Sequence, residues 1–157
     1  MNREEQITKK LRDLFNKMAW LNASKMKESL KSCKPSEVHC IEYIGKNEDS
    51  NVTKLAEAFY MTRGAISKLT KKLIEKGFAE SYQKPENKKE VYFKLVAQGQ
   101  KIFDTHEELH KEFVARDKAV FEQITEKQLD DILGFMEKYS KHLDAEIEKQ
   151  GIGLATE

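Results

Sequence analysis

The sequence predicts a mainly α-helical fold with one small β-hairpin, and three features support this. Only two prolines and seven glycines interrupt the 157 residues, which favours long helices. Near both ends of the chain, apolar residues recur at i, i+3 and i+4 steps, the spacing of one face of a helix. After Gly77 the pattern changes to two short runs of β-branched and aromatic residues around a polar turn, which is typical of a hairpin.

Residues 2 to about 31 predict one long helix with a continuous apolar face. Its apolar positions are Ile7, Leu11, Leu14, Phe15, Met18, Leu21 and Met26. Residues 32–35 end this helix, and residues 35–45 predict a shorter one that ends at a glycine. The apolar face of the long helix needs a partner to cover it.

Residues 50–77 predict two short helices joined by a tight turn. Ser50 or Asn51 fits the N-cap of the first helix, and Thr62 fits the N-cap of the second. Gly77 stands where a glycine is expected just past a helix end. Two such helices, the second rich in cationic and small polar side chains, form a helix-turn-helix.

The outward face of the second helix has the chemistry of a nucleic-acid contact. The side chains away from its apolar stripe are Thr62, Arg63, Ser67, Lys68 and Lys71. Arg63 lies in the first turn, where a helix entering the major groove presents its base-reading residues. Residues 62–94 hold nine Lys or Arg against four Glu, a net charge of +5, whereas the whole chain carries only +1. This concentration of positive charge predicts a phosphate-binding surface.

The hairpin is predicted to be the wing of a winged helix-turn-helix. Its strands span residues 79–83 and 90–95, and the polar tip between them, residues 84–89, contains Lys84, Lys88 and Lys89. We expect these lysines to reach the DNA backbone or the minor groove beside the recognition helix.

Two more long helices are predicted after the wing, from residue 97 to about 123 and from residue 125 to about 151. Thr125 fits the N-cap of the last helix, with Gln128 at the capping-box position. We therefore divide the chain into dimerisation helices (1–34 and 97–150), a winged helix-turn-helix DNA-binding domain (35–96) and a frayed tail (151–157). Pairing the end helices across a two-fold axis would bury their apolar faces and space two recognition helices about 34 Å apart. The predicted assembly is a homodimer.

Several other classes of protein are disfavoured. The sequence has no glycine-rich phosphate loop, no Ser/His/Asp constellation and no distinguishable carboxylate pair, so an enzyme is not expected. No run of about 18 apolar residues predicts a membrane span, and the charged N-terminus does not resemble a secretion signal, so we expect a cytoplasmic protein with reduced Cys33 and Cys40. A helical protein–protein adaptor without DNA specificity remains an alternative.

The segments NVTKLAEAF, MTRGAISKLTKKLIEKGFAE and KLVAQGQKIF, with the basic hairpin between the last two, resemble the MarR family of bacterial transcription regulators. The resemblance covers nearly the whole chain and implies a winged-helix dimer that binds a near-palindromic operator, usually as a repressor, under the control of a small ligand, oxidant or metal. It also implies recognition-helix positions at Thr62, Arg63, Ala65, Ser67 and Lys68. The wing departs from the family pattern of an Asp followed by Arg, since this chain has Glu86-Asn87-Lys88-Lys89 there. Lysine lacks the planar fork of arginine, which favours phosphate contact over minor-groove insertion.

A metal is one possible signal. His106 and His110 are i, i+4 on one helix and so lie on the same face, a spacing that can bind one ion. The resemblance to zinc-responsive members of the family implies a site made of these two histidines with His39 and Glu28. No cofactor is otherwise predicted. A redox signal through Cys40 and an apolar or phenolic effector are the remaining alternatives.

Overall fold

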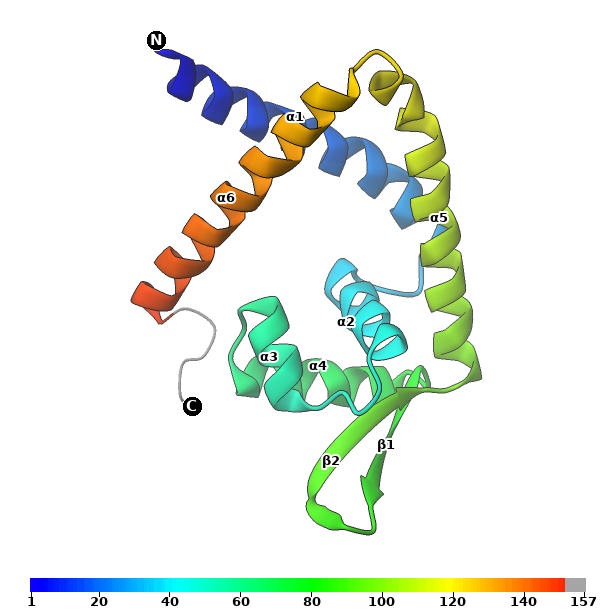
Figure 1. Cartoon of the computed structure of the whole chain (residues 1–157). Coiled ribbons are helices and arrows are strands. Elements are labelled where there is room, and N and C mark those ends of the chain that lie inside the picture. Colours follow the sequence, from blue (N-terminus) through cyan, green and yellow to red (C-terminus); the bar gives the residue numbers. More distant parts are fainter. Residues whose placement is uncertain (152–157) are drawn as a thin grey trace.

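A computed structural model describes residues 1–151 and contains six helices and one two-stranded antiparallel sheet (Figure 1). The elements are α1 (Arg3–Ser29), α2 (Pro35–Lys46), α3 (Val52–Phe59), α4 (Arg63–Glu75), β1 (Ala79–Lys84), β2 (Asn87–Leu95), α5 (Ala97–Phe121) and α6 (Glu126–Gln150). The mainly helical class with a hairpin wing is confirmed. Apart from its first residue, the tail that was predicted to fray lies outside the described residues.

Short-range signals fix the ends of the helix-turn-helix. The side-chain oxygen of Asn51 accepts a hydrogen bond from the Lys54 amide at 2.9 Å and so caps α3. The hydroxyl of Thr62 accepts one from the Ala65 amide at 3.1 Å and caps α4. Gly77, with φ of +78°, provides the left-handed backbone that ends the helix. These boundaries agree with the sequence predictions.

The α6 boundary also follows from the sequence. Thr125 and Gln128 form the predicted capping box, in which the Gln128 amide donates to the Thr125 hydroxyl at 3.1 Å. The Gln128 side chain in turn accepts from the Thr125 amide at 2.9 Å. At the other end, Gly151 is left-handed and caps the helix.

The hydrophobic core lies between α2, α3, α4, the base of the hairpin and the part of α5 from Ile102 to Phe113. Its centre is made by Ile41, Leu55, Ile66 and Leu73, each fully buried. Leu30, the residue that ends α1, closes one side of the core. The apolar face of α4 is therefore used for packing, and its opposite face is left for other contacts.

The sheet pairs Ala79 with Leu95 and Tyr82 with Tyr92, and its register shifts between Tyr82 and Lys84. The Phe93 amide also donates to the Ser50 carbonyl at 2.8 Å, which joins the hairpin to the loop before α3. The wing thus continues directly from the core.

The hairpin is longer than predicted. The strands extend through Lys84 and from Asn87, so the turn is formed by Pro85 and Glu86 alone. Cross-strand backbone pairing continues through polar residues that have little strand preference of their own, because the ladder bonds do not depend on the side chain. The predicted six-residue tip was therefore wrong in extent.

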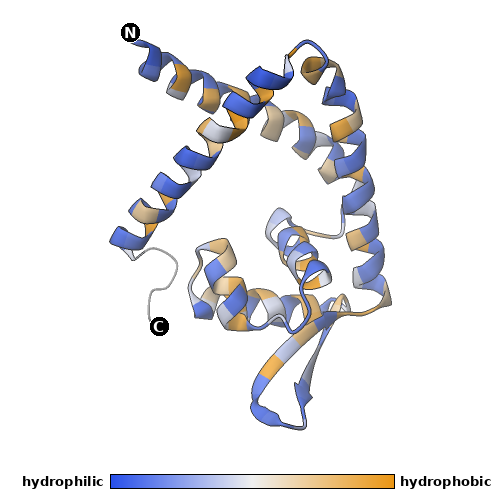
Figure 2. Ribbon diagram, viewed as in Figure 1, coloured by the Kyte–Doolittle hydropathy of each residue, from blue (hydrophilic) through white to orange (hydrophobic). Residues whose placement is uncertain are grey.

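The end helices project from the core and are largely solvated in the single chain (Figure 1). Neither α1 nor α6 has a buried residue, although each carries an apolar stripe (Figure 2). Phe15 is 71% exposed and Leu133 is 64% exposed. Exposed apolar faces of this kind are typical of protein–protein contact surfaces.

Within residues 1–151, no helix combines the length and the apolar character that crossing a bilayer would require.

Candidate nucleic-acid interface

The helix-turn-helix orients α4 by burying one of its faces. Ile66, Thr70 and Leu73 point into the core, and the Thr70 hydroxyl donates to the Ile66 carbonyl at 3.0 Å. The turn before α4 contains Tyr60 in the left-handed region, with φ of 53°. This conformation ends α3 and turns the chain into α4, and Arg63 in the first turn of α4 is exposed.

The predicted DNA-contacting residues of α4 fall into two groups. Those that are exposed are Arg63, Ser67, Lys68 and Lys71. Thr62 and Ala65 are half-buried, and the Thr62 oxygen is already occupied by the Ala65 amide. The exposed group can reach a base edge or a phosphate, whereas Thr62 mainly holds the helix start in place.

The wing lysines do not have equal freedom. Lys88 and Lys89 are exposed on β2 and form no ion pair with residues 1–151. Lys84 is only one-third exposed and is paired with the Asp49 carboxylate, with its ammonium also 5.1 Å from the centre of the Tyr92 ring. Asp49 therefore offsets the charge of Lys84, and Lys88 and Lys89 are the free cations of the wing.

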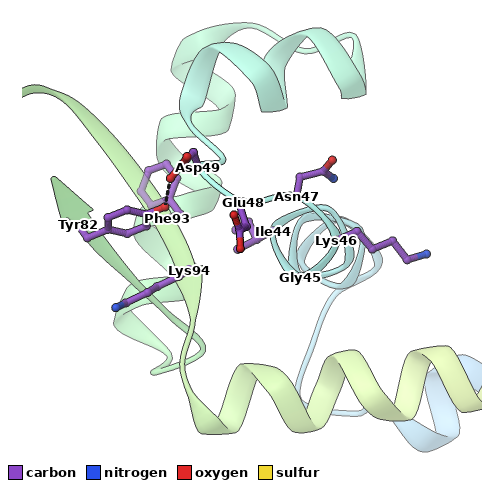
Figure 3. Close-up of a pocket in the computed structure, with 9 residues that line it drawn as sticks. All are labelled: Ile44, Gly45, Lys46, Asn47, Glu48, Asp49, Tyr82, Phe93 and Lys94. Carbon is purple, nitrogen blue, oxygen red and sulfur yellow. Dashed lines mark hydrogen bonds between the residues drawn. The ribbon is translucent and has the colours of Figure 1, made fainter. Parts of the chain in front are cut away.

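Asp49 also anchors the base of the wing. Its carboxylate accepts a hydrogen bond from the Tyr82 hydroxyl at 2.6 Å, and both residues line a shallow pocket of about 290 Å³ beside Phe93 (Figure 3). Hydrogen bonds from Lys84 and Tyr82 hold the pKa of Asp49 below its usual value, so the carboxylate stays charged at neutral pH. The loop before α3 thereby fixes β1 relative to the helix-turn-helix.

A second cluster of polar side chains lies between α2 and α5. Glu42, His106 and His110 each offer a ligand atom, and these atoms lie within 4.8 Å of one another. The Nε2 atoms of His106 and His110 are 3.2 Å apart, and Nδ1 of His106 is 3.6 Å from Oε2 of Glu42. The other oxygen of Glu42 accepts a hydrogen bond from Lys46 at 2.8 Å.

The chemistry of this cluster fits a divalent cation such as zinc. His106 is 4% exposed. Its Nε2 faces His110 and is the nitrogen that an ion between the two rings would use, while its Nδ1 faces Glu42 and has no hydrogen-bond partner among the described residues. Burial lowers the pKa of His106 and outweighs the Glu42 carboxylate, which raises it. The ring is therefore neutral at neutral pH, and the neutral ring is the form that binds metals. Two nitrogen ligands of a tetrahedral ion lie about 3.3 Å apart when each is about 2.0–2.1 Å from the ion. The Nε2 atoms of His106 and His110 are 3.2 Å apart, close to this value.

The structure brings two of the four predicted metal ligands together and leaves the other two outside the cluster. His106 and His110 come together as predicted. His39 is exposed on α2, one turn before Glu42, and its charge contributes to the lowered pKa of His106. Glu28 is exposed near the end of α1, and no ligand cluster of the described residues includes it.

Comparison with known proteins places these features in one family. The sequence model of the MarR family matches residues 34–91. The HTH-type transcriptional regulator PchR of Bacillus subtilis (strain 168) is 31% identical over 143 residues, which cover 91% of this chain and 82% of PchR. The chain belongs to the MarR family. It is therefore a helix-turn-helix transcription regulator and not an enzyme.

Solved structures of MarR regulators share the fold. Streptococcus pneumoniae FabT, crystallised in complex with DNA, has a TM-score of 0.79 and 20% identity, covering 90% of this chain and 98% of FabT. The adhesin competence repressor AdcR of Streptococcus pyogenes has a TM-score of 0.69 and 20% identity, covering 87% of this chain and 96% of AdcR. At these identities the likeness establishes the winged-helix architecture.

The predicted redox residue of this MarR chain lies in the core. Cys40 is 0% exposed, and burial raises the pKa of its thiol to about 12. A sensing cysteine needs access to the oxidant and a substantial thiolate fraction, and Cys40 has neither. The geometry does not support a redox role for Cys40.

Two residues of these clusters, Glu42 and Asp49, were not predicted from the sequence. Glu42 could have been found, because it is three residues after His39 on the same helix and so shares its face. Asp49 offered a weaker signal: an Asp in a polar loop tolerates the left-handed backbone seen there, with φ of 57°. That Asp49 pairs with the wing could not be read from its neighbours in sequence.

Proposed function

We infer that the protein binds a near-palindromic operator as a homodimer and represses transcription, with a small effector controlling the affinity. The observation that carries this proposal is the free cationic face of α4 beside the exposed Lys88 and Lys89 of the wing. A helix fixed by its buried face, with Arg63 in its exposed first turn, suits insertion into a major groove. Repression would take place in the cytoplasm, where the operator DNA is found.

The end helices supply the reason for a homodimer. Apolar residues exposed in the single chain include Leu14, Phe15, Met18, Leu21, Ile132, Leu133, Met136 and Leu143. These residues form stripes at helical spacing on α1 and α6. A second copy of the chain carries the same stripes, so the two copies can cover each other. A two-fold axis through these helices would present two α4 helices to one duplex, which supports an operator with matching half-sites.

The proposal is tested by selecting bound fragments from random DNA and titrating the protein against the recovered site by fluorescence anisotropy. We expect a two-fold symmetric site that binds more tightly than a scrambled duplex of the same composition. If six or more phosphates are contacted, affinity should fall about a thousandfold between 50 and 200 mM salt. Equal binding to both duplexes would instead support a protein–protein adaptor.

A metal is the second candidate for the signal, and the cluster between α2 and α5 favours it. We propose that Glu42, His106 and His110 hold zinc, with His39 as a further ligand from the same face of α2. Glu28 is the alternative ligand implied by family resemblance. Bound zinc would cross-link α2, which packs on α4, to α5, which leads to the dimer helices.

Calorimetry with zinc chloride tests the metal candidate. The wild-type protein should bind one zinc ion per chain, and a His106→Ala/His110→Ala variant should lose this binding. The matched control is His142→Ala, which removes the one histidine on α6. Glu42→Gln should weaken zinc more than Glu28→Gln does if the structural cluster is the site. Equal and weak binding by the wild type and the double variant would end the metal hypothesis.

A further inference from the structure

Glu37 is a buried carboxylate that takes no part in either site described above. It lies in the first turn of α2 and is 1% exposed. A buried charge is costly unless it is paired and hydrogen-bonded, so its partners show what the position is for. Those partners come from the α1–α2 loop and from the end of the recognition helix α4.

Lys76, the residue that caps the C-terminal end of α4, is the charged partner of Glu37. Its ammonium donates to Oε1 of Glu37 at 2.9 Å and to the Ser32 carbonyl at 3.3 Å. The same Oε1 accepts from the Lys34 amide at 2.8 Å. Two segments about 40 residues apart in sequence are thereby joined by charge-assisted hydrogen bonds.

The protonation state of Glu37 agrees with this pairing. Burial alone raises the pKa of a carboxyl group, but the hydrogen bonds from Lys76 and the Lys34 amide outweigh it, together with the charges of Lys76 and Lys72. The net result is a pKa below the usual value, so Glu37 is charged at neutral pH. Its second oxygen, Oε2, is buried without a partner in the described part of the chain. Burial of this unpaired oxygen costs free energy of folding, which the bonds to Oε1 must offset.

Lys76, which follows the last residue of α4, differs from Lys68 and Lys71 within the helix. Lys68 and Lys71 lie on the exposed face available to DNA, whereas the Lys76 side chain turns back to α2. A cation at a helix C-terminus is also favoured by the helix dipole. Lys76 therefore links α4 to α2, and the Glu37 carboxylate offsets its charge.

Because α4 is long, a small rotation at the end held by Lys76 produces a larger displacement at the other end. Its 13 residues span about 20 Å, so a tilt of about 10° at the anchored end would move the base-reading end by about 3 Å. Hydrogen bonds to base edges tolerate displacements of only about 0.5 Å. Contacts with phosphates made by flexible lysines tolerate more, because they depend on charge rather than on a fixed direction.

We propose that Glu37 and Lys76 are positioning residues for the recognition helix, which hold the end of α4 against α2 so that Arg63 meets its base in register. This inference rests on the proposed DNA-binding function. It makes Glu37 a determinant of specificity although it is buried and faces away from the DNA. Loss of the pair should reduce operator binding more than binding to random duplex.

The test compares the affinities of Glu37→Gln and Lys76→Met for the selected operator and for random duplex. We expect the operator-to-random ratio to fall about tenfold in both variants, comparable to the loss of one charge-assisted hydrogen bond. Lys76→Arg, which keeps the charge and the donors, should restore most of the ratio. A variant that was merely less folded would lose affinity for both duplexes equally, and the ratio would not change.

The sign of the Glu37→Gln effect separates positioning from net charge. Removing one negative charge should strengthen DNA binding by simple electrostatics, and the exposed control Glu75→Gln makes the same charge change nearby. Positioning predicts that Glu37→Gln binds the operator more weakly than Glu75→Gln does. Operator binding by Glu37→Gln that equals or exceeds that of the control would overturn the proposal.

A measurement without DNA keeps this inference separate from the proposed function. Hydrogen exchange of the backbone amides in residues 72–77 reports how firmly the end of α4 is held. These amides should exchange faster in Glu37→Gln than in wild type or Glu75→Gln. Faster exchange in a protein that prefers no duplex would contradict the function and leave the link standing, whereas unchanged exchange would refute the link.

Discussion

Two glycines determine how closely α5 can lie against the DNA-binding core. A Cβ atom on Gly99 would fall 1.9 Å from the carbonyl oxygen of Phe78, and one on Gly45 would fall 2.4 Å from the ring of Phe103. Real Cβ atoms do not approach other heavy atoms this closely, so both positions depend on having no side chain. They differ in what stands opposite, since a ring can rotate and a backbone oxygen is fixed by its own chain.

We predict that Gly99→Ala destabilises the protein by about 2–3 kcal/mol, through overpacking against rigid backbone. Gly45→Ala should cost less, because the Phe103 ring can move aside. Urea denaturation monitored by circular dichroism would measure both, with exposed Gln98→Ala at the same helix start as the control, expected within about 0.5 kcal/mol of wild type. A Gly99→Ala protein as stable as the control would show that α5 is not held this close to Phe78.

At the scale of elements, α4 and the wing present different cations at their surfaces. The exposed Arg63 has a planar fork that can pair with a guanine, whereas the wing offers Lys88 and Lys89, which are point charges suited to phosphate. Lys84 differs from Lys88 and Lys89, because it forms an ion pair with Asp49. The helix is therefore expected to read sequence and the strand β2 to add affinity.

We predict that Arg63→Ala loses about 1–3 kcal/mol of discrimination at one base position of the operator. Lys88→Ala should weaken binding equally on all sequences and reduce the salt slope by about 1. Anisotropy titrations on single-base operator variants at several salt concentrations measure both effects. Similar behaviour of the two variants would mean that the division between base reading and phosphate contact is wrong.

At the scale of the whole molecule, the single chain leaves apolar surface uncovered. The core under the winged helix is closed, but α1 and α6 present their apolar faces to water (Figure 2). Exposed apolar faces of this kind are typical of surfaces that a second protein surface covers. Operator binding by two linked α4 helices would also be stronger than by one, because the second contact becomes intramolecular.

We predict that Leu133→Glu/Met136→Glu converts the homodimer into monomers, since two charges would be buried in the apolar interface. Sedimentation velocity should give twice the chain mass for wild type and the single-chain mass for the variant, and operator affinity should fall with it. Lys127→Ala, at a position outside the apolar stripe of α6, is the control and should remain dimeric. A wild-type protein that sediments as a monomer at micromolar concentration would contradict the assembly.

The sequence by itself determined the order of the elements and the capped helix ends, because the signals that set them act over a few residues. The caps at Asn51, Thr62 and Thr125 each bond an amide three positions away, and Gly77 ends α4 through its own backbone conformation. The apolar spacing of each helix then showed which face is buried and, for α4, which face is free. The exposed face of α4 and the closeness of His106 to His110 were predicted on this basis.

Only the tertiary structure decided which distant charges meet. Three such contacts join residues 35, 39 and 64 positions apart in sequence. They are Lys84 with Asp49, Lys76 with Glu37, and His106 with Glu42. Each of these residues lies among many similar charges, and nothing in its local sequence marks one partner over another. Such pairs depend on how the helices pack, and the hydrophobic core sets that packing without reference to the charges at its edge.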